Sequence, residues 1–409
     1  MGALVQLGFG GWISRDGKMI LVEKTVRTVP YGFLGVLFAV YLTQLGFGAF
    51  AIGIVLALTV LSSAFYTFIV SFVADRFGRR RTLVFFALTD FVAGSLLFFS
   101  SAWWAPVLAG IVGNMTVGAG EVGPFLSLEQ AMLPRSCESN RRTLAFSVYN
   151  LVGYGASSVG ALVAVVPQYL GSGVGAYRPL FLVYMASGLV GAFLYSGMSK
   201  GVEVNYAQKR AVLSATARPI VFKLSALFGI DAFGGGFIGQ SILAYYFYIR
   251  FALQLSSLGL IFFATQIVTA LSFLLAARIA KTIGLLRTMV FTHIPSNIFL
   301  TAVAFAPTAL SSVILLMCRQ SLSQMDVPTR QSYVMAMVDE SDRTAAAGFT
   351  NTTRTVTSSI SPSIAGYAIA NIWVGMPLVA AGTLKLTYDL LIFTCFRHAK
   401  PPEETGVSV

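Results

Sequence analysis

Long apolar blocks separated by short polar joints make up most of this chain of 409 residues. Most blocks run for about 18 to 25 residues, the length that an α-helix needs to cross about 30 Å of hydrocarbon. They lack the period-two alternation of a closed β-barrel, the other structure that can span a bilayer. The pattern predicts an all-α integral membrane protein with about twelve spans. These are 23–43, 50–73, 83–99, 104–131, 144–166, 179–198, 222–247, 256–278, 288–306, 309–335, 344–370 and 373–396.

Composition and missing motifs exclude several classes of protein. Only 11% of the residues are charged and 56% are hydrophobic, whereas charged residues make up about 25% of soluble domains. A soluble fold of this size could not bury so much apolar surface. The sequence contains no Walker phosphate loop, HExxH, paired CxxC or GxSxG motif. We therefore expect no enzymatic activity, no cofactor and no metal.

The net charge of +12 is concentrated in alternate joints. If the N-terminus is cytoplasmic, the opposite joints hold only Arg178 and Arg250. This asymmetry follows the positive-inside rule, so we expect a multi-pass plasma-membrane protein with both termini in the cytoplasm. Nucleic acid is not an expected partner, because orientation accounts for the basic excess. The residues on the predicted cytoplasmic side are Arg76, Arg79, Arg80, Arg81, Arg135, Arg141, Arg142, Lys200, Lys209, Arg210, Arg218, Arg278, Lys281, Arg287, Arg343, Arg397 and Lys400.

The two halves of the chain repeat each other at an offset of about 204 residues. The longest polar stretch, 199–221, falls between the sixth and seventh spans. We therefore predict two pseudo-symmetric six-helix bundles, 1–198 and 222–409, joined by a cytoplasmic linker at 199–221. The matched pairs include Gly35 with Gly239, Tyr41 with Tyr245, and Gly78 with Gly284.

The joint after the second span reads ADRFGRRRTL, from Ala74 to Leu83. It resembles the signature that major facilitator proteins carry between their second and third helices, with Ser71 in place of the first glycine. The resemblance extends to helix count and linker position. It implies the fold of that superfamily and a secondary transporter with its substrate site at mid-membrane between the bundles. The fifth span lacks the Gly-Pro pair that is common in drug antiporters.

The resemblance also implies a gating motif at this joint, formed by Asp75, Arg76, Gly78 and Arg79. A carboxylate at position 75 can accept hydrogen bonds from a helix N-terminus or pair with arginine. Such a contact would hold the cytoplasmic side closed. The alternative is that the arginines only fix the topology and contact anionic lipid.

Charged residues inside a span are costly unless they are paired or face water, so each marks a candidate functional site. Arg27 and Asp231 correspond at the 204 offset. We expect them to form a pair, as a packing contact, a gate or a substrate contact. Arg319 lies seven residues before Asp326, so both fall on one helix face and are expected to interact. Three charged residues close to span ends are expected to snorkel to the interface: Glu129, Arg330 and Lys385.

Glu121 is the first candidate for proton coupling. It follows a run of small residues in the fourth span, and a carboxylate in apolar surroundings can take up a proton near neutral pH. The other coupling candidates are Asp231, Asp326 and Asp90. The candidates for contact with substrate in the cavity are Arg27, Arg319, Gln324, Arg354 and Tyr245.

The preferred hypothesis is a monomeric secondary active transporter that exports a small organic solute, such as a drug or a metabolite, by proton antiport. One alternative is proton-coupled uptake of a metabolite or organic anion, with Arg27, Arg319 or Arg354 contacting the anion. A further alternative is a membrane sensor that keeps the same fold without transport. The lipid bilayer, protons and the solute are the expected partners.

Overall fold

The computed structural model describes residues 12–116, 123–133, 136–137, 142–171, 173–202, 213–339 and 342–397. These ranges are helical apart from their joints and an isolated bridge between Ile13 and Cys137. The helices before position 199 are α2 (Arg15–Gln44), α3 (Ala49–Phe77), α4 (Arg79–Phe99), α5 (Trp104–Val112), α6 (Pro124–Met132), α7 (Arg142–Val163), α8 (Val166–Leu170) and α9 (Arg178–Ser196). Those after the linker are α10 (Ala217–Gly236), α11 (Gln240–Phe251), α12 (Leu255–Ile283), α13 (Leu285–Phe305), α14 (Ala309–Ser323), α15 (Asp326–Ala336), α16 (Arg343–Asn371) and α17 (Met376–Phe396).

The all-helical prediction is confirmed, and each predicted span overlaps a helix or a pair of helices. Within the described ranges, nine helical stretches are long and apolar enough to cross a membrane. The predicted spans 104–131, 222–247 and 309–335 are each broken into two helices. A glycine precedes the second helix at two of these breaks: Gly123, with φ 121°, precedes α6, and Gly239 precedes α11. Broken helices at membrane depth are tolerated where they border a cavity or other protein.

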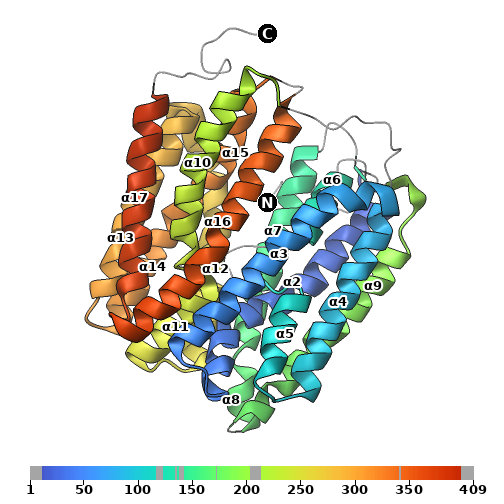
Figure 1. The fold of residues 1–409 in the computed structure, drawn as a ribbon, viewed down its shortest axis with the longest axis vertical. Coiled ribbons are helices and arrows are strands. Elements are labelled where there is room, and N and C mark those ends of the chain that lie inside the picture. The colour runs from blue at the N-terminus through green and yellow to red at the C-terminus, as the bar shows by residue number, and fades with distance from the viewer. Residues whose placement is uncertain are drawn as a thin grey trace, which may run out of the picture.

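Helices α2–α9 and α10–α17 form two groups that lie side by side (Figure 1). In the first group, α2 packs on α7 and α4 on α9, while α10 packs on α16 and α17 in the second. The groups meet along α3 with α16, α7 with α12 and α2 with α11. Equivalent glycines link the helix pairs α3–α4 and α12–α13: Gly78 has φ 94° and Gly284 has φ 88°. This left-handed backbone favours glycine, which explains why the sequence repeat keeps it.

The groups are held together at the end where α3 begins and α16 ends. A side chain added at Gly53 would collide with Pro362 and Gly366, because the two backbones cross there. On the α2–α11 contact, the Ser241 hydroxyl donates to the Gly35 carbonyl at 3.0 Å. Small residues allow such close approach of helices within a membrane. This end carries the joints predicted to be external.

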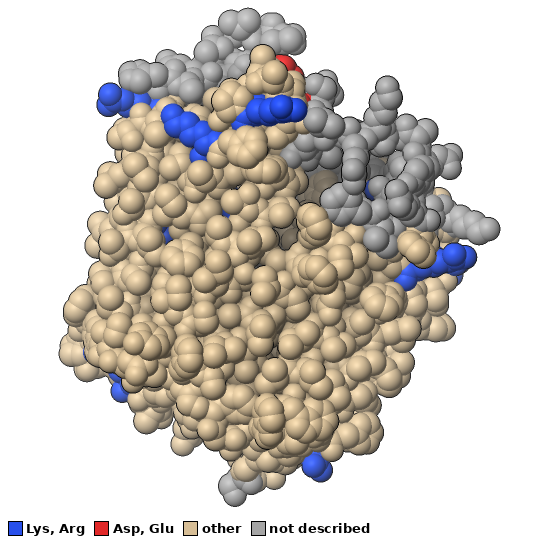
Figure 2. Space-filling view, in the orientation of Figure 1, with Lys and Arg blue, Asp and Glu red and all other residues tan. Residues whose placement is uncertain are grey.

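The opposite end carries the basic joints. In Figure 2, most of the Lys and Arg visible on this face lie toward one end of the molecule, above a wide surface with few charged side chains. Among the basic residues of that end, Arg80 donates to the Met198 carbonyl at 2.8 Å. Ser214 donates its amide and hydroxyl to Asp342 at 2.8 and 2.6 Å, and these hydrogen bonds lower the pKa of Asp342. Positions 203–212 of the predicted linker fall outside the described residues.

The crossing at Gly53 and Gly366 generates a prediction about access to the interior. Gly366→Val should force α3 and α16 apart, because its side chain would meet the Ala49 carbonyl. Overpacking of this kind costs roughly 1–3 kcal/mol. It destabilises only the conformation in which α3 and α16 are in contact at this end. A single cysteine replacing Ser358, which lines the interior, should therefore react several-fold faster with a membrane-impermeant maleimide applied from the predicted external side.

The matched control is Gly348→Val on the same helix, where an added side chain meets nothing within 4 Å. The labelled chains would have Cys137, Cys318 and Cys395 replaced by serine. Equal labelling rates in the Gly366→Val, Gly348→Val and unmodified backgrounds would show that this crossing does not control access.

Candidate functional site

A cavity of about 830 Å³ lies between the two groups of helices. The first group lines it mainly from α3 and α6, and the second from α10, α14, α15, α16 and α17. The two walls differ in charge. The first group contributes Arg79 as its charged lining residue among those described, whereas the second contributes Asp231, Arg319, Arg330, Arg354 and Lys385.

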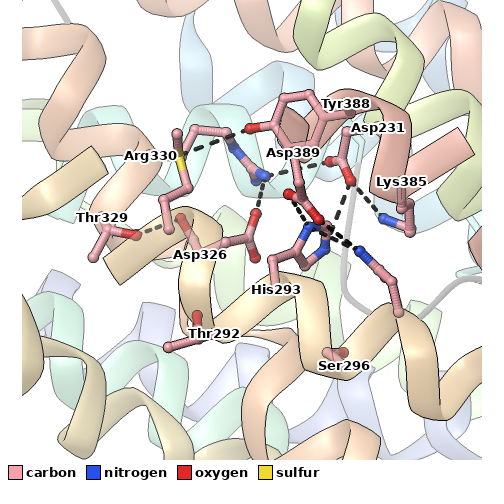
Figure 3. Close-up of polar contacts among 12 residues, drawn as sticks. Asp231, Thr292, His293, Ser296, Asp326, Thr329, Arg330, Lys385, Tyr388 and Asp389 are labelled. Carbon is pink, nitrogen blue, oxygen red and sulfur yellow. Dashed lines mark hydrogen bonds and ion pairs between the residues drawn. The ribbon is translucent and has the colours of Figure 1, made fainter. Parts of the chain in front are cut away.

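Asp231 of α10 is the centre of the charged wall. Its carboxylate lies 2.6 Å from Lys385 Nζ and 2.7 Å from Arg354 Nη1. Arg330 Nη1 is 3.5 Å away and also contacts Asp326 Oδ2 at 2.5 Å, so Arg330 lies between the two carboxylates (Figure 3). Asp231 is 2% exposed, and a buried carboxylate persists as an ion only when it is paired in this way.

His293 extends this wall to a third carboxylate. Its Nδ1 atom lies 2.8 Å from Asp389 Oδ1, and its Nε2 atom lies 3.8 Å from Asp231 (Figure 3). Asn297 donates to Asp389 Oδ2 at 3.0 Å. The cluster therefore joins α10, α13, α15, α16 and α17.

Arg319 of α14 lies in the same wall but has different partners. Its Nη1 atom donates to Gln320 Oε1 at 2.5 Å, and Ser323 donates to the same amide oxygen at 2.8 Å. Arg319 is 5% exposed and its Nε atom has no hydrogen-bond partner. No described carboxylate lies within 4 Å of its guanidinium group. Its charge is therefore the least compensated in the wall.

A second buried cluster lies inside the first group of helices. Arg27 of α2 contacts Glu23 Oε1 at 3.0 Å and Glu129 Oε2 at 2.7 Å. Tyr149 of α7 donates to Glu129 Oε2 at 2.7 Å and accepts from Lys24 Nζ at 3.1 Å. All five side chains are buried.

Tyr195 of α9 joins the two carboxyl groups of this cluster. Its hydroxyl oxygen lies 2.6 Å from Glu23 Oε2 and 2.7 Å from Glu129 Oε1. A tyrosine hydroxyl has one proton to donate. Both short contacts are hydrogen bonds at the same time only when one carboxyl group carries a proton and donates to Tyr195.

Asp90 of α4 adds another carboxylate beside this cluster. It accepts hydrogen bonds from Tyr31 at 3.0 Å, from Tyr184 at 2.9 Å and from the Asn114 amide at 2.8 Å. Arg27 lies 5.9 Å from the centre of the Tyr31 ring. In the part of the chain that the structure describes, Asp90 has no cation within 4 Å.

Two expected ion pairs are wrong. Arg27 and Asp231 belong to separate clusters, each with closer partners. Arg319 does not contact Asp326, whose partner is Arg330. The sequence offset relates equivalent positions in the two halves, and equivalent positions touch only near the axis that relates those halves. The helix break before Asp326 likewise removes the regular face that the spacing from Arg319 assumed.

The other candidates have separate outcomes. Gln324 and Arg354 line the cavity, and their contact with a substrate stays a prediction. Tyr245 is buried in α11, and neither it nor Arg27 belongs to the described lining. Gly78 ends α3, and Arg79 donates to the Ala131 carbonyl at 3.2 Å. Glu121 and the side chains of Asp75 and Arg76 fall outside the described residues.

Sequence reasoning missed several residues of both clusters. Glu129, Arg330 and Lys385 were expected to reach the interface, but they are 0%, 8% and 8% exposed. A signal was present for these three, because each falls inside a predicted span. The other cluster residues, whose partners the sequence did not predict, each have at least one partner on another helix: Glu23, Lys24, Tyr149, Tyr195, His293, Asn297 and Asp389.

The chain has recognisable relatives over nearly all of its length. The sequence model of the Major Facilitator Superfamily matches residues 26–362. The uncharacterized membrane protein YJR124C of Saccharomyces cerevisiae is 26% identical in an alignment that covers 94% of each chain. A D-xylose-proton symporter superposes with a TM-score of 0.73 and 12% identity, over 96% of this chain and 99% of its own. The nucleoside transporter NupG gives a TM-score of 0.69 and 16% identity, over 94% and 100%. These structures share the fold.

The contacts of Asp231 predict how stability responds to changes in charge. Asp231→Asn should lower the free energy of unfolding by roughly 3–5 kcal/mol, because it leaves the buried Lys385 and the half-buried Arg354 without their carboxylate partner. Adding Lys385→Met should recover part of this loss by restoring the balance of charge. The measurement is thermal unfolding of the purified variants in detergent.

Arg27→Met in the Asp231→Asn background is the control that separates this network from the expected Arg27–Asp231 pair. It should recover nothing, because Arg27 belongs to the other cluster. Recovery with Arg27→Met in place of Lys385→Met would contradict the contacts described for both clusters.

Proposed function

The chain belongs to the Major Facilitator Superfamily, and on this premise we propose that it moves a small organic solute across its membrane by alternating access, with protons as the coupling ion. The observation that carries this proposal is the cavity between the two groups of helices, lined from both sides. The groups cross closely at Gly53 and Gly366, below the lining residues of α3. Rocking of the two halves about a fixed central site is how such transporters alternate access.

The proposed coupling group is Glu23. If both short contacts of Tyr195 are hydrogen bonds, one carboxyl group in the cluster carries a proton, either Glu23 or Glu129. Glu129 accepts short hydrogen bonds from Arg27, Tyr149 and Tyr195, at 2.7 Å in each case. Such donors favour a carboxylate.

Glu23 is the better proton carrier because its contacts with Arg27 are longer, at 3.0 and 3.1 Å. A protonated Glu23 would donate a hydrogen bond to the Tyr195 hydroxyl, which would in turn donate one to Glu129. The charges of the cluster agree with this assignment. Glu23, Glu129 and the neighbouring Asp90 carry three negative charges when ionised, against two positive charges on Lys24 and Arg27, so one proton makes the group neutral. Glu121 stays a sequence-based candidate.

The proposed transport is tested in proteoliposomes that hold the purified protein in a known orientation. An imposed proton gradient should drive accumulation of at least one solute from a panel of sugars, nucleosides, organic acids and lipophilic amines. Collapse of the gradient with a protonophore should abolish the accumulation. The direction predicted from the sequence is export, and opposite gradients applied to the same vesicles distinguish export from uptake. Absence of gradient-dependent flux for the whole panel would support a sensor on this fold.

Glu23→Gln should separate solute movement from its coupling to protons. The amide can donate to Tyr195 as a protonated carboxyl group does, so we expect the free energy of unfolding to change by less than about 1 kcal/mol. Solute exchange should persist while accumulation falls to the equilibrium level, because an amide does not release a proton. Both rates are measured in the same proteoliposomes, at several pH values.

Glu129→Gln is the matched control. Its amide oxygen can still accept from Arg27 and Tyr149, but the substitution removes the carboxylate charge that lies 2.7 Å from Arg27 in a buried pair, so it should destabilise the fold by roughly 3–5 kcal/mol. Accumulation at the wild-type level in Glu23→Gln would eliminate Glu23 as the coupling group.

A further inference from the structure

We infer that the cavity binds an organic anion whose acidic group contacts Arg319. This inference rests on the proposed transport function and names the class of solute. It follows from three observations: the charges of the cavity wall, the guanidinium of Arg319 that has no described carboxylate within 4 Å, and the apolar character of the facing wall.

The first observation is an imbalance of charge. The wall cluster contains three described carboxylates, Asp231, Asp326 and Asp389. Against them stand four cations, namely Arg319, Arg330, Arg354 and Lys385. One positive charge is therefore left over, before any charge on His293 is counted. Uncompensated charge inside a membrane protein is costly and marks a binding site for the opposite charge.

The second observation locates the excess charge at Arg319. Lys385, Arg354 and Arg330 each lie within 4 Å of Asp231. Arg319 is in contact with the neutral amide of Gln320 instead. It lines the cavity and is 5% exposed, and its Nε donor is unpaired. The planar guanidinium group matches a carboxylate, sulfonate or phosphate through paired N–H donors.

The third observation describes the rest of the solute. The facing wall from α3 is lined mostly by apolar side chains, among them Leu56, Val60, Leu61, Phe65 and Phe68. A solute that contacts both walls would therefore place its acidic group toward α14 and an apolar body toward α3. Ligand sites of this size combine mainly apolar walls with a few fixed polar groups.

The test measures the charge preference of the cavity without transport. A single cysteine is placed at Gln324, which lines the cavity and directly follows α14, in a chain whose native cysteines are serine. The probes are the 2-sulfonatoethyl and 2-trimethylammonioethyl methanethiosulfonates, with each rate divided by its rate for free 2-mercaptoethanol. We expect the anionic reagent to be favoured about tenfold, as one nearby unscreened charge produces. Arg319→Gln should remove most of this preference.

Two variants control for structural damage. Arg319→Lys keeps the charge and should keep the preference. Arg218→Gln removes an exposed cation outside the cavity and should change nothing. The inference is overturned if the chain that retains Arg319 shows no preference for the anionic reagent, or if the preference survives in Arg319→Gln.

Ligand competition supplies an independent arm. Benzoate at millimolar concentration should slow the labelling of the cysteine at Gln324, while its neutral isostere benzamide should not. Phenyl phosphate in the same assay compares a phosphate with a carboxylate, and protection by either anion supports the site. Equal effects of benzamide and both anions would overturn the inference.

Labelling needs no proton gradient, so the two proposals can fail separately. Charge-selective labelling without any gradient-driven flux would reject only the proposed function. Gradient-driven flux without a preference for the anionic reagent would reject only the inferred anion site.

Discussion

The compensation of buried charge is the constraint on which this structure depends. Removing one partner from a buried ion pair costs roughly 3–5 kcal/mol, so charged residues inside the spans must find partners from other helices. Asp231 meets this requirement through α15, α16 and α17. Glu129 meets it through α2, α7 and α9. These contacts hold each helix group together around a polar centre and fix which helix faces turn inward.

The two polar centres are not equivalent, although the two halves of the sequence resemble each other. The described residues of the cluster around Glu129 do not line the cavity, and tyrosine hydroxyls link them. The cluster around Asp231 forms a wall of the cavity and is rich in arginine and lysine. Counted over the described residues, the first together with the neighbouring Asp90 lacks one positive charge, and the second lacks one negative charge. A proton and an organic anion would correct both deficits, which gives the two proposals a common physical origin.

Close helix crossings set the geometry in which these centres act. Gly53 and Gly366 let α3 and α16 touch at one end, while the lining residues of both helices border the cavity beyond that crossing. The broken helices contribute to the same region. The break between α10 and α11 places Ile238 and Gly239 in the lining, and the break between α14 and α15 places Gln324 there. Backbone groups released by these breaks border the cavity, where water or solute can satisfy them.

The sequence by itself determined the helical membrane architecture, because the length of an apolar block and the hydrocarbon thickness are local quantities. It also determined the repeat, since Gly78 and Gly284 need the same left-handed backbone, and it indicated that Arg319, Gln324 and Arg354 belong to the cavity. Only the tertiary structure decided the partners. Arg27 pairs with Glu129 and Asp231 with Lys385, because contact depends on the rotation and break of each helix. A one-residue change turns a side chain by about 100°, and a sequence pattern does not fix this angle.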